Sequence, residues 1–565
     1  MSNPETSGSL LLVDADQHRP LLEEQPSSSA ASESRPNDTA KTPYLWNERA
    51  HVDDLSEQRW GVIAPEGAEG DRLLAIARPL LRKREEDQGA PPIIYRVPPR
   101  MDALQSMTWR REVFDTGAHF RDALPRYQLI LGDLHQVSAD LQVTQAIDAF
   151  VGRLAFDELE DYAAYVDKLL RWEREPAPSD RRRLLLHTVH DGTRSTAIGY
   201  RELVRPSLDL LDRAIKYKPD LQRVDLLESG SDDDPYPDEL LSAAGHTSPT
   251  VLFSLSHGDG APRRGWRSYE LQRRHQGAMS FGSSGSLTGE LLRSRPFLPG
   301  GLWFMLACFS AGTPSTSKFE RWLRLLGQSG AATSRPADVL RSLPATDQAP
   351  FVASIPKAAL ANPDGPLGFI GHVDLAWTYA FRRVDSNDRA QSRPARFGEL
   401  LRAAVEGSRI GVAFRELYSA FTQIDSELVY RQADPNTPPE RRGHLWMLRQ
   451  DLAGYILLGD PAARLPTPKP IAQAVPPEPP QSSGGDLAGF FGFAVGREQE
   501  QEQAPASKPK PKLSELERAI AEVLAGADLR RAAGELSLDP AALRTMVERY
   551  RDAGRAALRR AGDVD

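Results

Sequence analysis

The chain has 565 residues, of which 40% are hydrophobic and 26% charged, and its formal net charge is −8. This length suggests two to four domains, and so small an acidic excess excludes a basic nucleic-acid surface over the whole chain. Cys308 is the only cysteine, which excludes an intramolecular disulfide framework and fits a reducing cytoplasm.

The first 57 residues are rich in Ser, Pro, Glu, Asp and Asn, and they predict a disordered leader over 1–57. Their start has neither a cationic region nor a long apolar run, so we expect no signal peptide. No uninterrupted apolar stretch reaches the roughly 18 residues that predict a membrane span. The sequence therefore favours a cytoplasmic protein that has no membrane partner.

Between this leader and residue 464, short apolar runs alternate with helical patterns. Strands are expected at 60–64, 93–97, 127–133, 184–189, 251–256, 302–307, 351–355 and 367–371, and helices at 70–88, 158–174, 198–216 and after 396. Buried runs separated by helices are typical of a mainly parallel sheet covered on both faces. The pattern predicts an α/β domain over 58–464, with its chemistry beyond the carboxyl ends of the strands.

Two of these strand ends carry reactive side chains followed by small residues. The first is Ser256-His257-Gly258-Asp259-Gly260, and the second is Ala307-Cys308-Phe309-Ser310-Ala311-Gly312. Cys308 follows His257 by 51 residues, and a His about 50 residues before the Cys is the caspase-type arrangement. Two strand ends at that distance can lie on adjacent strands of one sheet.

Together these residues supply the parts of a nucleophilic site. The thiolate is the nucleophile, and an imidazole can take the proton of Cys308 and later protonate a leaving amine. The Gly258 N–H, with that of Cys308, would stabilise the oxyanion. The alternative is structural, because a buried cysteine usually only fills space.

At these residues the chain resembles the gingipain family of cysteine peptidases, which are relatives of caspases and of CHAT domains. The resemblance extends over 59–464 in weaker segments. They are Tyr127-Gln-Leu-Ile-Leu-Gly-Asp133, Asp148-Ala-Phe-Val-Gly-Arg-Leu154, Tyr162 to Glu173, Gly371-His-Val-Asp-Leu-Ala-Trp377 and Leu458-Gly-Asp-Pro-Ala-Ala-Arg-Leu465.

The resemblance implies a caspase-like α/β sandwich and a cysteine endopeptidase in which His257 and Cys308 form the catalytic dyad. Family members often add an acid that orients the histidine, and Asp191 is the candidate here, with helix N-capping as its alternative role. Gingipains are secreted with pro-segments, whereas this chain is expected inside the cell. That difference favours a regulated protease in signalling or defence.

Many members of this clan prefer Arg or Lys at P1, held by a buried acid. Asp259 and Asp374 are the candidate acids, and Trp377 is a candidate wall for such a pocket. For each Asp the alternative is a solvated or capping role.

No metal or cofactor is expected from the sequence. His187 and His190 are three residues apart on a predicted strand, so they face opposite sides and cannot share a metal. The segment 281–289 is rich in glycine and serine but lacks the Gly-Lys-Ser ending of a phosphate-binding loop, which excludes nucleotide binding there.

The C-terminal part predicts a Pro-rich charged linker over 465–512 and a small helical module over 513–565. An apolar island at 487–495 is either a docking motif or a patch folded onto the main domain. The module resembles a helix-turn-helix. Its arginines are nearly balanced by acids, which favours binding of a protein partner or oligomerisation over DNA binding.

Three hypotheses follow from these patterns. The leading one is an intracellular cysteine endopeptidase that cleaves protein substrates. The second is a non-catalytic caspase-like scaffold, and the third is a DNA-linked regulator that acts through the module at 513–565.

Overall fold

The computed structural model describes residues 12–20 and most of 51–467, with gaps at 115–123, 178, 180, 232–233, 329–335, 344–347 and 385–389. Of the C-terminal part it describes 523, 529–535, 543 and 547. The chain divides into two compact units, 1–473 and 474–565. The predicted linker, apart from residues 465–467, lies outside the described residues.

The first unit is built on a ten-stranded sheet with the order β3-β2-β4-β5-β18-β15-β12-β8-β6-β7 among the described residues. Its strands are β2 (Trp60–Pro65), β3 (Ile93–Val97), β4 (Tyr127–Leu131), β5 (Phe150–Leu154), β6 (Arg182–Val189), β7 (Leu221–Ser229), β8 (Thr250–Leu255), β12 (Leu302–Leu306), β15 (Gly368–His372) and β18 (Tyr455–Gly459). All neighbours are parallel except β15 and β18. The predicted α/β class is confirmed.

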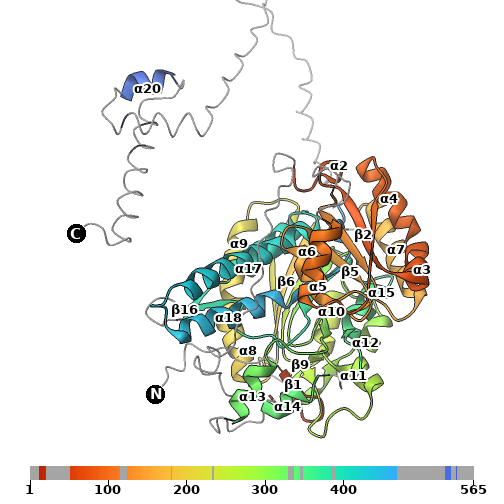
Figure 1. The fold of residues 1–565 in the computed structure, drawn as a ribbon, viewed down its shortest axis with the longest axis vertical. Helices are drawn as coiled ribbons and strands as arrows, with labels where there is room; N and C mark the ends of the chain where they lie inside the picture. Colours follow the sequence, from red (N-terminus) through yellow and green to blue (C-terminus); the bar gives the residue numbers. More distant parts are fainter. Residues whose placement is uncertain are drawn as a thin grey trace, which may run out of the picture. The chain divides into compact units, whose positions relative to one another are not determined.

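Helices cover both faces of this sheet (Figure 1). One layer contains α9 (Arg205–Ile215), α16 (Ala395–Val405), α17 (Ile410–Ala433) and α18 (Pro439–Ala453). The other contains α3 (Gly67–Ile76), α4 (Arg78–Gln88), α7 (Leu159–Arg174), α12 (Gly289–Arg293) and α15 (Ser354–Ala361). Because central strands such as β12 are buried along their whole length, they read in the sequence as continuous apolar runs.

Prolines explain two of the places where the elements differ from the predicted ones. The strand expected at 351–355 is wrong: only Phe351–Val352 is a strand, β14, and it pairs with β13 (Gly312–Thr313) outside the main sheet. Pro356 then lies in the first turn of α15, where a missing N–H costs nothing. The helix expected over 70–88 is divided at Ala77, and Pro79 starts its second part.

A second, four-stranded sheet has the order β1-β9-β10-β11. It consists of β1 (Leu12–Asp14), β9 (Gly258–Gly260), β10 (Met279–Ser280) and β11 (Ser286–Leu287). The structure differs here from the disordered leader predicted over 1–57, because residues 12–20 are packed against the domain. Near its other end, α2 (Leu55–Gln58) also lies in the predicted leader.

In the second unit the structure describes helix α20 (Leu529–Glu535), which lies within the predicted helical module. Ala533 is buried together with Leu543 and Val547. The helix-turn-helix and its partners stay predictions.

Candidate active site

His257 and Cys308 lie at matching positions past the ends of two neighbouring parallel strands. Leu255 is the register partner of Leu306, and the Ser256 N–H continues the ladder to the Leu306 carbonyl at 3.3 Å. Each reactive residue comes two positions after this last pair. The side chains of both are fully buried. The ladder thus places the two residues that sequence reasoning singled out just past the ends of neighbouring strands.

Gly258 packs directly against the backbone of Cys308. A Cβ atom at this position would lie 1.9 Å from the Cys308 carbonyl oxygen, so only glycine fits. On one side of β9, the Asp259 N–H donates to the Ala278 carbonyl and the Ser280 N–H donates to the His257 carbonyl. The N–H of Gly258, which lies between His257 and Asp259, therefore points to the opposite edge of β9.

Three side chains from one loop surround Nε2 of His257. Thr193 Oγ1 lies at 2.9 Å, Ser195 Oγ at 3.3 Å and Asp191 Oδ2 at 3.6 Å. Asp191 is itself buried, and its Oδ1 accepts bonds from the Thr193 N–H and from Thr196 Oγ1. The predicted acid therefore lies beside the histidine, where a carboxylate can orient the ring.

The alternative role of Asp191 as a helix N-cap does not match its position. Helix α8 (Arg194–Gly199) begins after Thr193, which occupies the N-cap. Sequence reasoning missed Thr193 and Ser195 as neighbours of the histidine. The signal was present in the run of small polar residues that follows strand β6.

The thiol of Cys308 is held by the loop that follows β15. The Ala376 N–H points at Sγ from 3.3 Å, and the Phe309 N–H donates to the Asp374 carbonyl. Phe309 has a φ of 55°, a left-handed conformation that is costly for a bulky side chain. Such strain directly after a reactive residue is typical of functional sites. Sequence reasoning did not find Ala376, because a backbone donor leaves no signature.

A buried carboxylate anchors the same loop. Asp451 accepts the N–H groups of Trp377 at 2.9 Å and Ala380 at 2.8 Å. Burial raises the pKa of Asp451 well above its ordinary value. The Trp377 ring is fully buried and packs edge-on against Trp322, with ring centroids 5.1 Å apart. Trp377, which belongs to this loop, is thus packed against another aromatic ring and away from solvent.

The two predicted P1 acids are both buried, and each already has partners within the protein. Asp374 accepts bonds from Ser317 Oγ and the Lys318 N–H, and burial raises its pKa to about 6. Asp259 accepts a bond from Ser286 Oγ at 2.6 Å and lies 3.6 Å from Nδ1 of His18. Burial also raises the pKa of Asp259.

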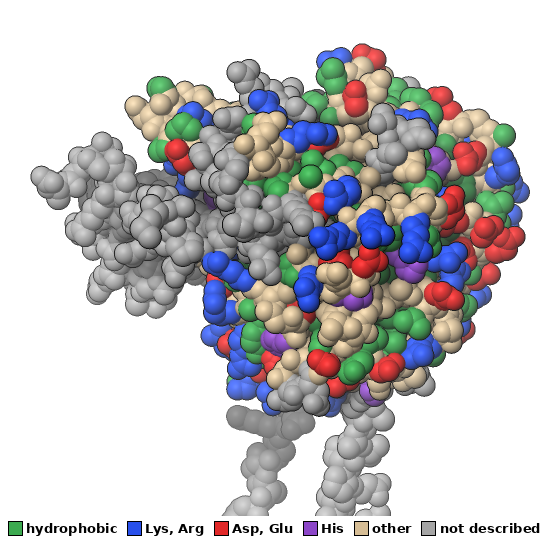
Figure 2. Space-filling model, turned by 90° about the horizontal axis from the view of Figure 1, so that it is seen from below, with side chains coloured by type: hydrophobic (Ala, Val, Ile, Leu, Met, Phe, Trp, Pro, Cys, Tyr) green, Lys and Arg blue, Asp and Glu red, His purple; other side chains and the backbone are tan. Residues whose placement is uncertain are grey.

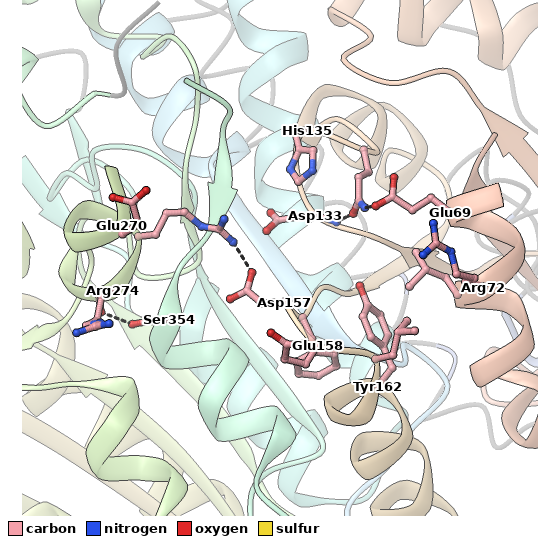
Figure 3. A pocket seen from close by; sticks show the side chains of 15 residues that line it. Glu69, Arg72, Asp133, His135, Asp157, Glu158, Tyr162, Glu270, Arg274 and Ser354 are labelled. Atoms are coloured by element: carbon pink, nitrogen blue, oxygen red, sulfur yellow. Dashed lines mark hydrogen bonds and ion pairs between the residues drawn. The ribbon is translucent and has the colours of Figure 1, made fainter. Parts of the chain in front are cut away.

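The cavity drawn in Figure 3 lies away from these residues. It has a volume of about 640 Å³ and lies between α3, the segment after β5 and α11 (Tyr269–His275). Its walls are charged, and two of the acids that line it, Asp133 and Asp157, bind Lys357. Within the described residues no group of three or more His, Cys, Asp or Glu side chains could hold a metal ion.

Figure 2 views the molecule from below, the side on which β1, β9 and α11 lie in Figure 1. Lys and Arg side chains gather near the middle of this face. The segment between β9 and α11 contains the exposed residues Arg263, Arg264 and Arg267. No described helix is both long and apolar enough to cross a bilayer.

The sequence matches no protein-family model and no curated protein. Several solved structures are similar to this chain. The Arg-specific cysteine proteinase gingipain R has 12% identity and a TM-score of 0.43 over 75% of this chain and 80% of its own.

A complex of the pro- and mature domains of RgpB from Porphyromonas gingivalis has 13% identity and a TM-score of 0.39, covering 72% of this chain and 79% of that one. The separase–securin complex from Saccharomyces cerevisiae has 11% identity and a TM-score of 0.27, covering 63% of this chain and 16% of that one. The α/β class of the fold follows from the mainly parallel ten-stranded sheet and from the helices on both of its faces. The resemblance to gingipains that the sequence motifs indicate has a counterpart in these structural similarities.

Proposed function

We propose that this protein is a cysteine endopeptidase in which His257 and Cys308 act as a catalytic dyad. The observation that carries the proposal is the register of β8 and β12, which sets the two side chains at matching positions past adjacent strand ends. A cysteine that only filled space would need neither this partner nor a strained residue after it. The close packing of Gly258 on Cys308 is a further support.

In the proposed reaction, the Cys308 thiol passes its proton to His257, and the thiolate attacks the substrate carbonyl carbon. The C–S bond forms, and negative charge develops on the carbonyl oxygen near the N–H groups of Gly258 and Cys308. His257 then protonates the leaving amine as the C–N bond breaks. A water molecule, deprotonated by His257, hydrolyses the thioester and releases the thiol.

Asp191 has a positioning role in this proposal. It approaches Nε2 of His257 at 3.6 Å, and in this proposal the other ring nitrogen, Nδ1, exchanges the proton with the thiol. A carboxylate beside the imidazole stabilises the imidazolium that forms during the reaction. Thr193 Oγ1 contacts the same nitrogen and fixes the ring plane.

We further propose that substrates carry a basic residue near the cleaved bond. Asp259 directly follows the His-Gly pair, and its carboxylate already lies beside one imidazole, that of His18. A Lys or Arg side chain that replaced this imidazole would gain a buried acid partner.

The test is hydrolysis of fluorogenic peptides that differ at P1, by the full chain and by the variants Cys308→Ala and His257→Ala. We expect cleavage after a basic residue, and a loss of at least about 10³-fold in both variants. His246→Ala is the matched control, because His246 is exposed and far from Cys308 in sequence. Cleavage that survives in Cys308→Ala would overturn the proposal.

A further inference from the structure

The edge of β9 next to His257 is covered by the chain's own N-terminal segment. Strand β1 runs parallel to β9, and Leu12, Val13 and Asp14 pair with Gly258, Asp259 and Gly260, respectively. The two strands lie side by side in Figure 1. Leu12 and Val13 are fully buried. This short segment is therefore docked into the domain although it lies far from it in sequence.

The covered edge is the one that a substrate carbonyl would have to reach. Asp259 uses its N–H and its carbonyl for Ala278 and Gly277, on the β10 side. Backbone groups alternate along a strand, so Gly258 and Gly260 present theirs to β1. The Gly258 N–H is the proposed oxyanion donor. Leu12 is the register partner of Gly258, so an acyl group bound to that donor would compete with the start of β1 for the same edge.

The segment also contacts Asp259, the acid that is proposed to bind a basic side chain of the substrate. After β1 the chain turns back: Asp14 Oδ1 accepts the N–H groups of Asp16 and Gln17, and Val13 forms a bridge with Pro20. This turn carries His18, whose Nδ1 lies 3.6 Å from Oδ1 of Asp259. The nearby carboxylate of Asp259 raises the pKa of His18, which favours the cationic form of the imidazole.

We propose that the edge of β9 is a peptide-docking edge, and that segment 12–20 is its built-in occupant, which an incoming extended peptide with a basic side chain must displace. Pairing of an extended peptide with a sheet edge supplies affinity through backbone hydrogen bonds. Asp259 and Ser286 then select a peptide that carries a basic side chain. The effect that docking of segment 12–20 has on catalysis rests on the proposed function. Occupancy by the segment lowers the apparent affinity for any peptide that competes for the edge.

The test uses full-length protein with the substitution Val13→Pro. Val13 lies between Gly258 and Gly260 in the register, and proline removes its N–H from this ladder. A fluorescein-labelled peptide of residues 8–20 is the probe, and its binding is measured by fluorescence anisotropy, which needs no catalysis. His18→Ala is a second variant that leaves the backbone intact, and His246→Ala is its control.

We expect the probe to bind Val13→Pro at least about tenfold more tightly than it binds wild type, and His18→Ala to show a smaller gain. A probe peptide in which His18 is alanine should bind more weakly to each protein. On a cleaved fluorogenic peptide, Val13→Pro should raise kcat/KM by a similar factor, with the probe as a competitive inhibitor.

Equal probe affinity in wild type and both variants, or no binding to any of them, would overturn the docking proposal. Tighter binding to the variants without hydrolysis by any protein would support docking and contradict the peptidase. Circular dichroism shows whether Val13→Pro folds. If it does not fold, the probe affinity of His18→Ala is compared with that of His246→Ala, and equal affinities overturn the docking proposal.

Discussion

The two halves of the ten-stranded sheet end their strands in different ways. At the ends of β4 and β5, Asp133 and Asp157 share one cation, Lys357, whose Nζ lies 2.7 and 2.8 Å from them. At the ends of β8 and β12 stand an imidazole, whose Nε2 lies 3.6 Å from the Asp191 carboxylate, and a thiol, whose Sγ accepts the Ala376 N–H rather than facing a cation. Charges that neutralise one another hold a fold together, whereas a proton-transfer pair is available for chemistry.

In the half of the sheet that contains β8 and β12, replacement of His257 should have the largest effect on activity. His257→Gln removes the proposed base, so we expect kcat/KM to fall by at least about 10⁴-fold while the melting temperature changes little. His246→Gln on the surface is the control and should leave kcat/KM unchanged. Residual activity within tenfold of wild type would mean that another group takes the proton.

In the half of the sheet that contains β4 and β5, replacement of Lys357 should lower the stability of the fold and leave the chemistry intact. Burial alone would raise the pKa of Asp133, but Lys357 and the N–H groups of Leu134 and Val352 together outweigh burial, and the pKa is lowered. Lys357→Met leaves this carboxylate buried without its cation, which should cost about 3–5 kcal/mol of unfolding free energy.

Urea denaturation measures this loss. The control is Lys318→Met, which breaks the exposed pair with Asp140 and should cost less than about 1 kcal/mol. Activity per folded molecule should be preserved in both variants. A Lys357→Met protein as stable as wild type would show that the buried pair is not what holds this half together.

Asp191→Asn tests the positioning of the ring at Nε2. It keeps the size of the side chain and removes its charge, so we expect kcat to fall by about 10²-fold with KM little changed. The pH–rate profile should shift as well, because the imidazolium loses its partner. Asp225→Asn is the control, since Asp225 pairs with Arg183 on β6 and β7. Equal losses in both variants would indicate a merely structural role.

The smallest effect concerns the buried acid in the thiol loop. Burial raises the pKa of Asp374 to about 6. The folded state then binds more protons than the unfolded state between about pH 4 and 6, so this group's contribution to stability falls as pH rises through that window.

Asp374→Asn should abolish this dependence. The difference in unfolding free energy between variant and wild type should grow by about 2 kcal/mol in favour of the variant from about pH 4 to about pH 7. Chemical denaturation at both pH values measures it. A difference that does not vary with pH would place the pKa of Asp374 near its ordinary value.

Several features of the site were readable from the sequence. Apolar runs that end in Ser-His-Gly and Ala-Cys predicted β8 and β12 as neighbours, and the structure pairs them. Buried strands are legible because both their faces need apolar side chains. Strand β7 was missed, because it is an edge strand in which Arg223 and Asp225 interrupt the apolar pattern.

Other parts of the site depend on contacts between residues distant in sequence. Nothing local to Leu12 predicts that it pairs with Gly258, since a run of three residues carries no periodicity. Likewise, the Ala376 N–H reaches Cys308 only because Asp451, on α18, fixes the loop between them. Backbone donors and long-range anchors of this kind require the folded structure.

The rate of Cys308 alkylation by iodoacetamide as a function of pH tests the central claim most directly, because this is the only thiol in the chain. A thiol paired with His257 should react well below the ordinary thiol pKa of about 8.5, and His257→Ala should lose this reactivity. The same slow rate, with the same ordinary pKa, in wild type and His257→Ala would contradict the dyad.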